Sequence, residues 1–205
     1  ISSYIGLIKR RLQAEDDAEL HEFLGYAIDG AQRMDRMIID MLDYSRIGRQ
    51  STPFQDVDLS QAVKQALSSL SAGIAESGAE IVVETPLPTV TGSASEIERL
   101  FQNLIGNAIK FRAQGRPPSV TINCRDGGNE WIISIADNGI GIDPAMHGRL
   151  FALFSRLVSQ QQYEGTGIGL AACRKIAEHH GGRIWVESAR DQGSVFHVAL
   201  SKQRN

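Results

Sequence analysis

The sequence predicts an α+β fold, in which helices cover one face of a mixed or antiparallel sheet, preceded by a helical hairpin. Three observations indicate it. The first 47 residues contain no proline and repeat apolar residues at helical spacing, a linker rich in turn-forming residues follows at 48–53, and the rest of the chain mixes helical with strand-like patterns. We therefore expect a helical domain over residues 1–50 and a two-layer α/β sandwich over residues 51–205.

The composition limits the chain to one or two domains and excludes several classes of protein. Its 205 residues are 42% hydrophobic, and a net charge of -3 argues against nucleic acid as a partner. Cys124 and Cys173 lie far apart, which argues against a disulfide framework or a zinc site. No apolar run approaches the roughly 20 residues that span a bilayer, and the amino end does not resemble a cleaved signal. We expect a cytoplasmic region without direct membrane contact, although a longer parent protein could still be membrane-bound.

The amino-terminal domain carries a stripe of apolar or small residues with alternating four- and three-residue spacing. Its members are Leu20, Leu24, Ala27, Ala31, Met34, Ile38, Met41 and Ser45. The same spacing over residues 1–12, and an acidic stretch at 15–17, predict two antiparallel helices with a short polar connection. A second copy of the chain would cover the stripe, which predicts a homodimer built around a four-helix bundle. The alternative is a hairpin that packs on its own domain.

The sandwich begins with a predicted helix and a short strand. Asp58 and Gln61 form a capping pair that opens a helix, and this helix is expected to end at Gly78. The strand follows over residues 81–84.

A second helix and a hairpin come next. Ser93 and Glu96 form a capping box for a helix that runs to about Arg112, with Ile97, Leu100, Leu104, Ala108 and Phe111 on its buried side. Alternating residues over 120–124 and 131–135, separated by a glycine-containing turn, predict a β-hairpin. After a glycine-rich region the pattern predicts a helix to His180 and strands over 184–187 and 195–200.

One face of the second helix carries polar residues. Asn103, Asn107 and Lys110 are spaced i, i+4, i+7 and therefore share a face. An asparagine oxygen suits Mg²⁺, and a lysine one turn later could neutralise phosphates. The alternative is an ordinary solvated polar face.

Asp137 ends the second hairpin strand and opens the segment 137–143, which contains Gly139 and Gly141. In a strand, Asp137 would point to the same side as Trp131, Ile133 and Ile135, because side chains alternate between the two faces. Its carboxylate should therefore enter the same interior and need a hydrogen-bond donor there. The amine of adenine would serve, and glycines would let the backbone pass close to the base. A β-turn alone would also explain much of this segment.

Two further segments complete the candidate site. Residues 165–170 place glycine-freed backbone amides at the start of a helix, which is typical of an anion site but matches neither a P-loop nor a dinucleotide fingerprint. Residues 151–156 precede the polar run 160–162, and they could form one wall of a lid over the nucleotide or a short amphipathic helix before a loop.

Together the four segments resemble the N, G1, F and G2 boxes of the sensor histidine kinase catalytic domain, as NLIGNAIKF, DNGIGID, FALF and GTGIGLA. The resemblance covers the chain from Asp56 onward, and only the last glycine turn, at 191–196, departs from the family pattern. It implies the Bergerat-type ATP-binding fold with ATP and Mg²⁺ as ligands. The run from His179 to Ser188 resembles the phytochrome-associated branch.

The resemblance assigns a role to each candidate. Asn107 would ligate Mg²⁺, Asn103 and Lys110 would assist at the phosphates, and Asp137 would fix adenine. The rest of the pocket would be Phe111, Gly139, Gly141, Ile142, Phe154, Arg156, Gly165, Thr166, Gly167, Ile168, Gly169 and Leu170. The γ-phosphoryl group would pass to a histidine of the dimerisation helix and then to an aspartate of a response regulator receiver domain.

The hairpin resembles the family's dimerisation and phosphotransfer domain without its acceptor histidine. His21 is followed by Glu22, but the basic residue and proline of the acceptor motif do not follow. We therefore expect the acceptor to lie upstream of Ile1, and the 205-residue chain alone not to phosphorylate itself.

Two other functions stay open. One is an ATPase of the same superfamily, which would carry a glutamate where this chain has Asn103. The other is a non-catalytic nucleotide-binding or dimerisation module, against which Asn107, Lys110 and Asp137 argue.

Overall fold

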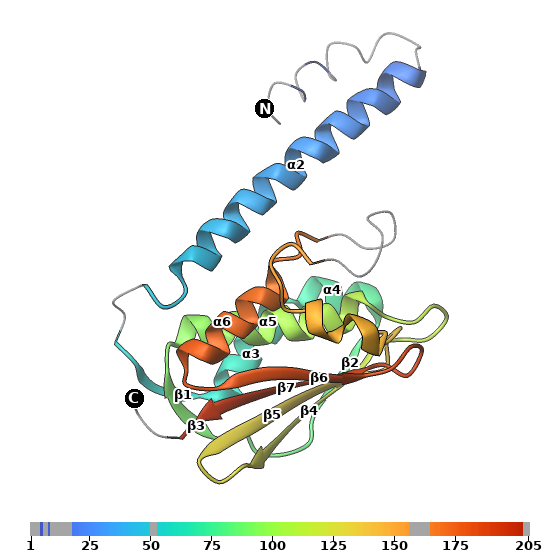
Figure 1. The fold of residues 1–205 in the computed structure, drawn as a ribbon. Helices are drawn as coiled ribbons and strands as arrows, with labels where there is room; N and C mark the ends of the chain where they lie inside the picture. Colours follow the sequence, from blue (N-terminus) through green and yellow to red (C-terminus); the bar gives the residue numbers. More distant parts are fainter. Residues whose placement is uncertain (1–4, 6–7, 9–17, 50–52, 156–164, 203–205) are drawn as a thin grey trace. The chain divides into compact units, whose positions relative to one another are not determined.

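A computed structural model of the chain describes residues 5, 8, 18–49, 53–155 and 165–202 (Figure 1). The chain divides into two compact units, residues 1–45 and 46–205. Each unit is described by itself.

The first unit is dominated by one long helix, α2, which spans Ala18–Arg46. Several apolar side chains of the expected stripe are exposed on it, among them Met34 (51%), Ile38 (58%) and Met41 (40%). Ile5 and Ile8 are helical, whereas most of the expected first helix and its acidic connection lie outside the described residues. None of the described helices is long and apolar enough to cross a membrane.

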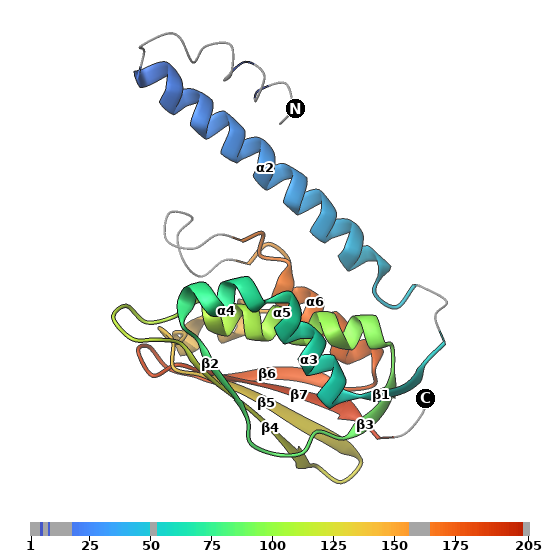
Figure 2. The ribbon, with the colours of Figure 1, turned by 180° about the vertical axis from the view of Figure 1, so that it is seen from behind.

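The second unit is a two-layer α+β sandwich, as predicted. Its main sheet has the strand order β2-β4-β5-β7-β6, in which only the β2–β4 pair is parallel. Helices α3 to α6 cover one face of this sheet (Figures 1 and 2). The strands are β2 Glu80–Val83, β4 Ser119–Asp126, β5 Glu130–Asp137, β6 Arg183–Ser188 and β7 Ser194–Ser201. The helices are α3 Leu59–Ser69, α4 Ser71–Ser77, α5 Ala94–Lys110 and α6 Gly169–His179.

The core lies between α5 and the sheet. Helix α5 buries Ile97, Leu100, Leu104 and Ala108 as predicted, together with Phe101 and Ile105, while Phe111 is only half-buried because it caps the helix. From the sheet come Ile122, Ile133, Ile135 and Val198, each at most 1% exposed. Burial of a side chain of this kind contributes roughly 1.5–3 kcal/mol. This packing fixes which face of α5 is left for a ligand.

The predicted helix between Asp58 and Gly78 is two helices. The Asp58 side chain does cap α3, by accepting from the Ser60 N–H at 2.8 Å, and Gly78 closes α4 with a φ of 65°. At Leu70 the backbone leaves helical geometry (φ -96°, ψ 3°), although no proline or glycine marks the break. Since α3 and α4 both contact α5, tertiary packing overrides the local pattern here.

The capping box at the start of α5 was predicted wrongly, although the helix begins where expected. Ser93 is the N-cap residue, but its side chain makes no capping hydrogen bond, and its Oγ lies 3.3 Å from Ser95 Oγ instead. The Glu96 carboxylate accepts from the Gly48 N–H and contacts His179. In place of the predicted local capping bond, Glu96 therefore bonds to Gly48 and His179, which are distant in sequence.

Two strands were not predicted. β1 (Gln55–Asp58) pairs antiparallel with β3 (Thr89–Gly92) to form a separate two-stranded sheet. Each has only four residues, too few to show a convincing alternation.

Candidate nucleotide site

The polar face of α5 lies against the start of α6. Asn103, Asn107 and Lys110 are each partly exposed, in a helix whose other face is buried. A Cβ placed at Gly169 would lie 2.9 Å from Asn103 Oδ1, and one at Gly165 would lie 2.8 Å from Lys110 Nζ. The structure therefore brings together two segments that are far apart in sequence, and the ends of the Asn103 and Lys110 side chains lie close to the glycine backbone there.

The amino end of α6 is open to a ligand. The helix begins at Gly169, and the preceding residue, Ile168, is fully buried and provides no side-chain cap. The first amides of a helix have no partner within the helix, so they are available to an anion. Thr166, Gly167 and Leu170 are partly exposed beside this end.

Asp137 lies at the end of β5, on the same face as Ile133 and Ile135. Its Oδ1 accepts hydrogen bonds from the N–H groups of Gly139 (2.8 Å) and Ser194 (3.2 Å). Burial raises the pKa of this carboxyl group, while these two hydrogen bonds and the nearby Arg116 oppose the rise. The described residues offer Oδ2 no donor, so one oxygen is left for a ligand.

The glycine loop after Asp137 is held between α5 and the β6–β7 turn. The Ile140 N–H donates to the Phe111 carbonyl at 3.0 Å, and the Ile140 carbonyl accepts from the Asp191 N–H at 2.7 Å. A Cβ at Gly139 would lie 2.3 Å from the Phe111 oxygen. At Gly141, which has a φ of 67°, it would lie 1.8 Å from the Ala189 oxygen. Any other residue at either position would push the loop out of place.

Neighbouring side chains that the sequence did not single out complete this wall. The Ser188 Oγ accepts from the N–H of Ile142, a half-buried residue, at 2.8 Å and donates to the Gly193 carbonyl at 2.7 Å. Arg116 donates to the Asn138 carbonyl. Phe111 is half-buried beside the loop, and Lys110 Nζ lies 4.5 Å from its ring centroid. Serine and arginine are common surface residues, so no sequence signal could have marked these two.

Residues 151–155 form turns after the short 3₁₀-helix η1 (Pro144–Arg149), not a helix of their own. Phe154 has a left-handed backbone (φ 60°) and a side chain that is 48% exposed. A Cβ at Gly167 would lie 2.9 Å from the Phe154 carbonyl carbon, so this segment contacts the glycine-rich start of α6. Arg156 and the polar run 160–162 lie outside the described residues.

Comparison with known proteins agrees with this geometry. A family model described as "Histidine kinase-, DNA gyrase B-, and HSP90-like ATPase" matches residues 92–204. Cyanobacterial phytochrome A from Nostoc sp. is 42% identical over 200 residues, which cover 98% of this chain and 26% of that protein. The adaptive-response sensory kinase SasA from Rippkaea orientalis is 34% identical over 199 residues, which cover 95% of this chain and 51% of that kinase.

A solved structure shares the fold. The crystal structure of histidine kinase ThkA in complex with the response regulator protein TrrA matches with a TM-score of 0.69 at 21% identity, over 98% of this chain and 57% of that chain. The chain thus spans about a quarter of the phytochrome and about half of SasA. The family match covers more than half of the chain and includes every segment of the site. The chain therefore belongs to the histidine kinase-, DNA gyrase B- and HSP90-like ATPase family, and within it is the ATPase core of a sensor histidine kinase.

Proposed function

We propose that this chain binds Mg²⁺-ATP and transfers the γ-phosphoryl group to a histidine of a dimerisation helix, for relay to an aspartate of a response regulator. The observation that carries the proposal is the contact of Asn103 and Lys110 with the glycine-rich segment 165–169. This contact supplies an anion-binding region. Asp137, which lies beside Gly139 and so close to Phe111 at the carboxyl end of α5, would add a base-recognition group.

The residues around Asp137 fit an adenine base. Its half-buried carboxylate has one oxygen held by two backbone amides, so the other can accept from an exocyclic amine. Gly139 and Gly141 leave no side chain between the loop and its neighbours. Phe111 and Ile142 would provide apolar contacts to the base.

The α5–α6 region fits the phosphates and a metal ion. The Asn107 side chain offers a hard oxygen ligand for Mg²⁺, and Lys110 offers a cation close to Gly165. The uncapped first turn of α6 adds backbone N–H donors. ATP supplies the phosphoryl group, while these residues position it and neutralise charge, which is how most phosphoryl-transfer sites accelerate the reaction.

Asn103 favours phosphoryl transfer over hydrolysis. A superfamily ATPase would need a general base to activate water, and the amide of Asn103 cannot accept a proton at neutral pH. Its Oδ1 faces the start of α6, near Gly169. We infer that bound ATP is protected from water attack and kept for a histidine nucleophile.

The helical unit would provide the dimer. Exposed Met34, Ile38 and Met41 lie on one stripe of α2, and a second copy of the chain would bury them. ThkA, which shares the fold over both units, was crystallised with a response regulator, and this supports a receiver domain as the phosphoryl acceptor here.

The histidines of the described catalytic unit are poor acceptors. His180 is 5% exposed with both ring nitrogens engaged, His179 contacts Glu96, and the His197 Nδ1 lies 2.8 Å from Ser134 Oγ. His147 lies in η1. We propose that His21, at the start of α2, is not the acceptor either, since its sequence context does not match.

Labelling with γ-labelled ATP tests the proposal. The native protein that contains this chain should gain an acid-labile, base-stable phosphoryl group, and Asn107→Ala should abolish it. The 205-residue chain should bind ATP without gaining label, and His21→Ala should change nothing. Labelling of the chain that His21→Ala removes would overturn the assignment of the acceptor.

A further inference from the structure

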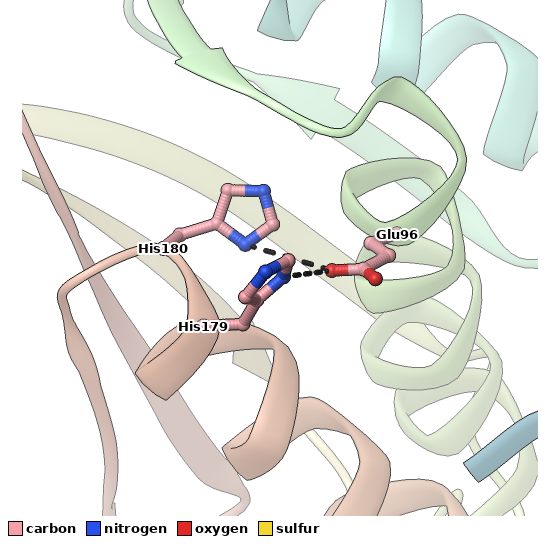
Figure 3. Close-up of side chains that lie close together, drawn as sticks. All are labelled: Glu96, His179 and His180. Carbon is pink, nitrogen blue, oxygen red and sulfur yellow. Dashed lines mark hydrogen bonds and ion pairs between the residues drawn. The ribbon is translucent and has the colours of Figure 1, made fainter. Parts of the chain in front are cut away.

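A cluster of titratable side chains lies outside the nucleotide site, where the start of α5 meets the end of α6. Glu96 Oε2 is 2.7 Å from His179 Nδ1 and 3.9 Å from His180 Nδ1 (Figure 3). Three such groups could in principle hold a metal ion. The hydrogen bonds of His180 decide whether they do.

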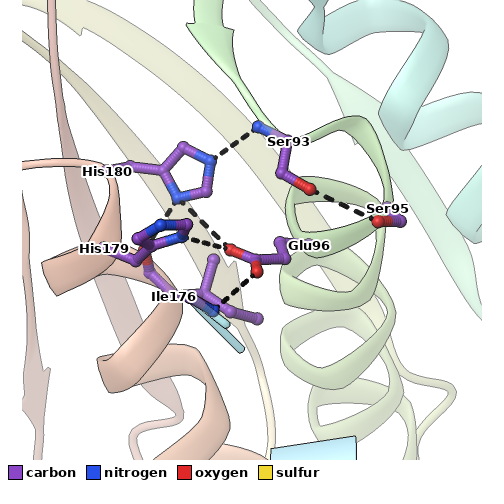
Figure 4. Close-up of polar contacts among 7 residues, drawn as sticks. Ser93, Ser95, Glu96, Ile176, His179 and His180 are labelled. Carbon is purple, nitrogen blue, oxygen red and sulfur yellow. Dashed lines mark hydrogen bonds and ion pairs between the residues drawn. The ribbon is translucent and has the colours of Figure 1, made fainter. Parts of the chain in front are cut away.

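His180 is committed to the fold through both ring nitrogens. Its Nε2 accepts from the Ser93 backbone N–H at 3.0 Å, so Nδ1 carries the proton and donates to the Ile176 carbonyl at 2.8 Å (Figure 4). A Cβ at Gly92 would lie 2.6 Å from the ring, so glycine is required beside it. A metal ion bound to Nδ1 of His180 would require the ring proton to move to Nε2. Two N–H groups, that of Nε2 and that of Ser93, would then face each other. The cluster is therefore a poor metal site.

Glu96 reaches instead to the segment that directly follows α2. Its Oε1 accepts from the Gly48 N–H at 3.0 Å, while Oε2 pairs with His179. Gly48 has a φ of 74°, and a Cβ there would lie 3.3 Å from the His179 ring. The neighbouring Ile47 is only 4% exposed. The carboxylate thus holds the segment that follows α2 against both α5 and α6, all within the second unit.

A second attachment lies at Phe54. Its ring stacks on His180 with 4.9 Å between centroids and meets His179 edge-on at 5.0 Å. The next residue, Gln55, begins β1 and pairs with Gly92, beside Ser93. His179 therefore lies beside the segment at both Gly48 and Phe54, and His180 contacts it at Phe54.

We propose that Glu96, His179 and His180 form a clasp that pins the segment after α2 to the catalytic unit, and so sets how much chain is free to move between the two units. At about 3.3–3.6 Å per residue, the chain from Arg46 reaches about 7 Å to Gly48 but about 30 Å to Gln55. An open clasp would lengthen the tether by this difference. Since phosphoryl transfer requires the catalytic unit to reach a histidine on the helical unit, the clasp would limit that reach, a consequence that rests on the proposed function.

Protonation of His180 should weaken the clasp, because it removes the acceptor that fixes the ring on which Phe54 stacks. A proton on His180 Nε2 would replace its acceptor lone pair and face the Ser93 N–H. The titratable groups facing His180 are Glu96 from α5 and His179 from α6, while Phe54 and Ser93 bring none. Burial lowers the pKa of His180, with Glu96 opposing and His179 adding to the shift. The neutral form is therefore the one that the closed arrangement requires.

Nuclear magnetic resonance of the 205-residue chain tests the clasp. At neutral pH the His180 nitrogen shifts should show the Nδ1–H tautomer, and the Gly48 amide should exchange with solvent at least 10-fold more slowly than in Glu96→Ala. The backbone order parameter of Gly48 should fall from about 0.85 to below about 0.6 in that variant. Glu98→Ala is the matched control, because Glu98 lies on the same helix and bonds to Gln102 instead.

The outcomes separate the clasp from the nucleotide site. ATP affinity should stay within twofold of wild type in Glu96→Ala, as in Glu98→Ala. An Nε2–H tautomer, a Gly48 amide unprotected in the wild type, or equal acceleration by Glu98→Ala would overturn the clasp. If the wild type protects Gly48 but does not bind ATP, the clasp stands and the proposed function fails.

Discussion

Replacing Asp137 with asparagine separates base recognition from folding. In the structure Oδ1 accepts from Gly139 and Ser194, and an asparagine oxygen can accept both bonds in the same geometry, although more weakly than a carboxylate. The second oxygen becomes an amide that carries only donors, so it would face the donor amine of adenine. The fold should therefore survive while the nucleotide loses its partner.

The size of the effect follows from the hydrogen bond that is lost. A hydrogen bond to a charged group contributes about 1.5–3 kcal/mol, and each 1.4 kcal/mol is a factor of ten in affinity, so the Kd for ATP should rise roughly 10- to 100-fold. The folding stability of the ligand-free Asp137→Asn variant should stay the same or increase. Because burial raises the pKa of Asp137, the ionised carboxylate costs folding free energy at neutral pH, a cost that grows as pH rises through the folded pKa.

Isothermal titration with Mg²⁺-ATP and thermal melting of the ligand-free protein measure both effects. The variant should bind more weakly yet melt at or above the wild-type temperature. Equal affinity would remove Asp137 from base recognition. A lower melting temperature with weaker binding would mean that the carboxylate is structural and that the loss of affinity is indirect.

Three further predictions follow from other parts of the chain. Asn107→Ala should remove the magnesium dependence of nucleotide affinity and leave the circular dichroism spectrum unchanged, whereas an unfolded variant would make Asn107 a structural amide. Replacing Leu24 and Ile38 with glutamate should convert a dimer to a monomer, as measured by light scattering, without changing ATP binding. The reason is that each apolar side chain buried in the dimer contributes about 1.5–3 kcal/mol. A monomeric wild type would contradict the dimer. Burial lowers the pKa of His180 and His197, so the free energy of unfolding in urea should fall as pH drops below about 6.5, by up to about 1.4 kcal/mol per pH unit for the buried His180 and by less for His197, whose charge solvent screens; a pH-independent value between 7.5 and 5.5 would refute this.

The sequence predicted those parts of the fold in which local pattern and tertiary packing agree. The β4–β5 hairpin was confirmed because its apolar residues alternate and its turn contains Gly127 and Gly128. The apolar side of α5 was confirmed because its period matches the single buried face. The break at Leu70 could not be predicted, since packing on α5 causes it and no local residue marks it.

The candidate site was predictable where backbone conformation restricts the residue type. Gly139 and Gly141 are required by contacts with Phe111 and Ala189, and such glycines are visible in sequence before their contacts are known. Ser188 and Arg116 were missed because their roles depend on partners distant in sequence. Glu96 had a plausible local role as a capping residue, and the fold gives it a distant partner instead.

One titration tests the central claim that α5, the loop after Asp137 and the start of α6 form a single ATP site that does not hydrolyse its ligand. Calorimetry of the 205-residue chain with ATP, with and without Mg²⁺, is combined with an assay of phosphate release. We predict one ATP bound per chain, tighter binding with Mg²⁺, and negligible phosphate release, because Asn103 cannot act as a general base. Absence of saturable binding would contradict the site, and rapid phosphate release would show instead that the chain is an ATPase.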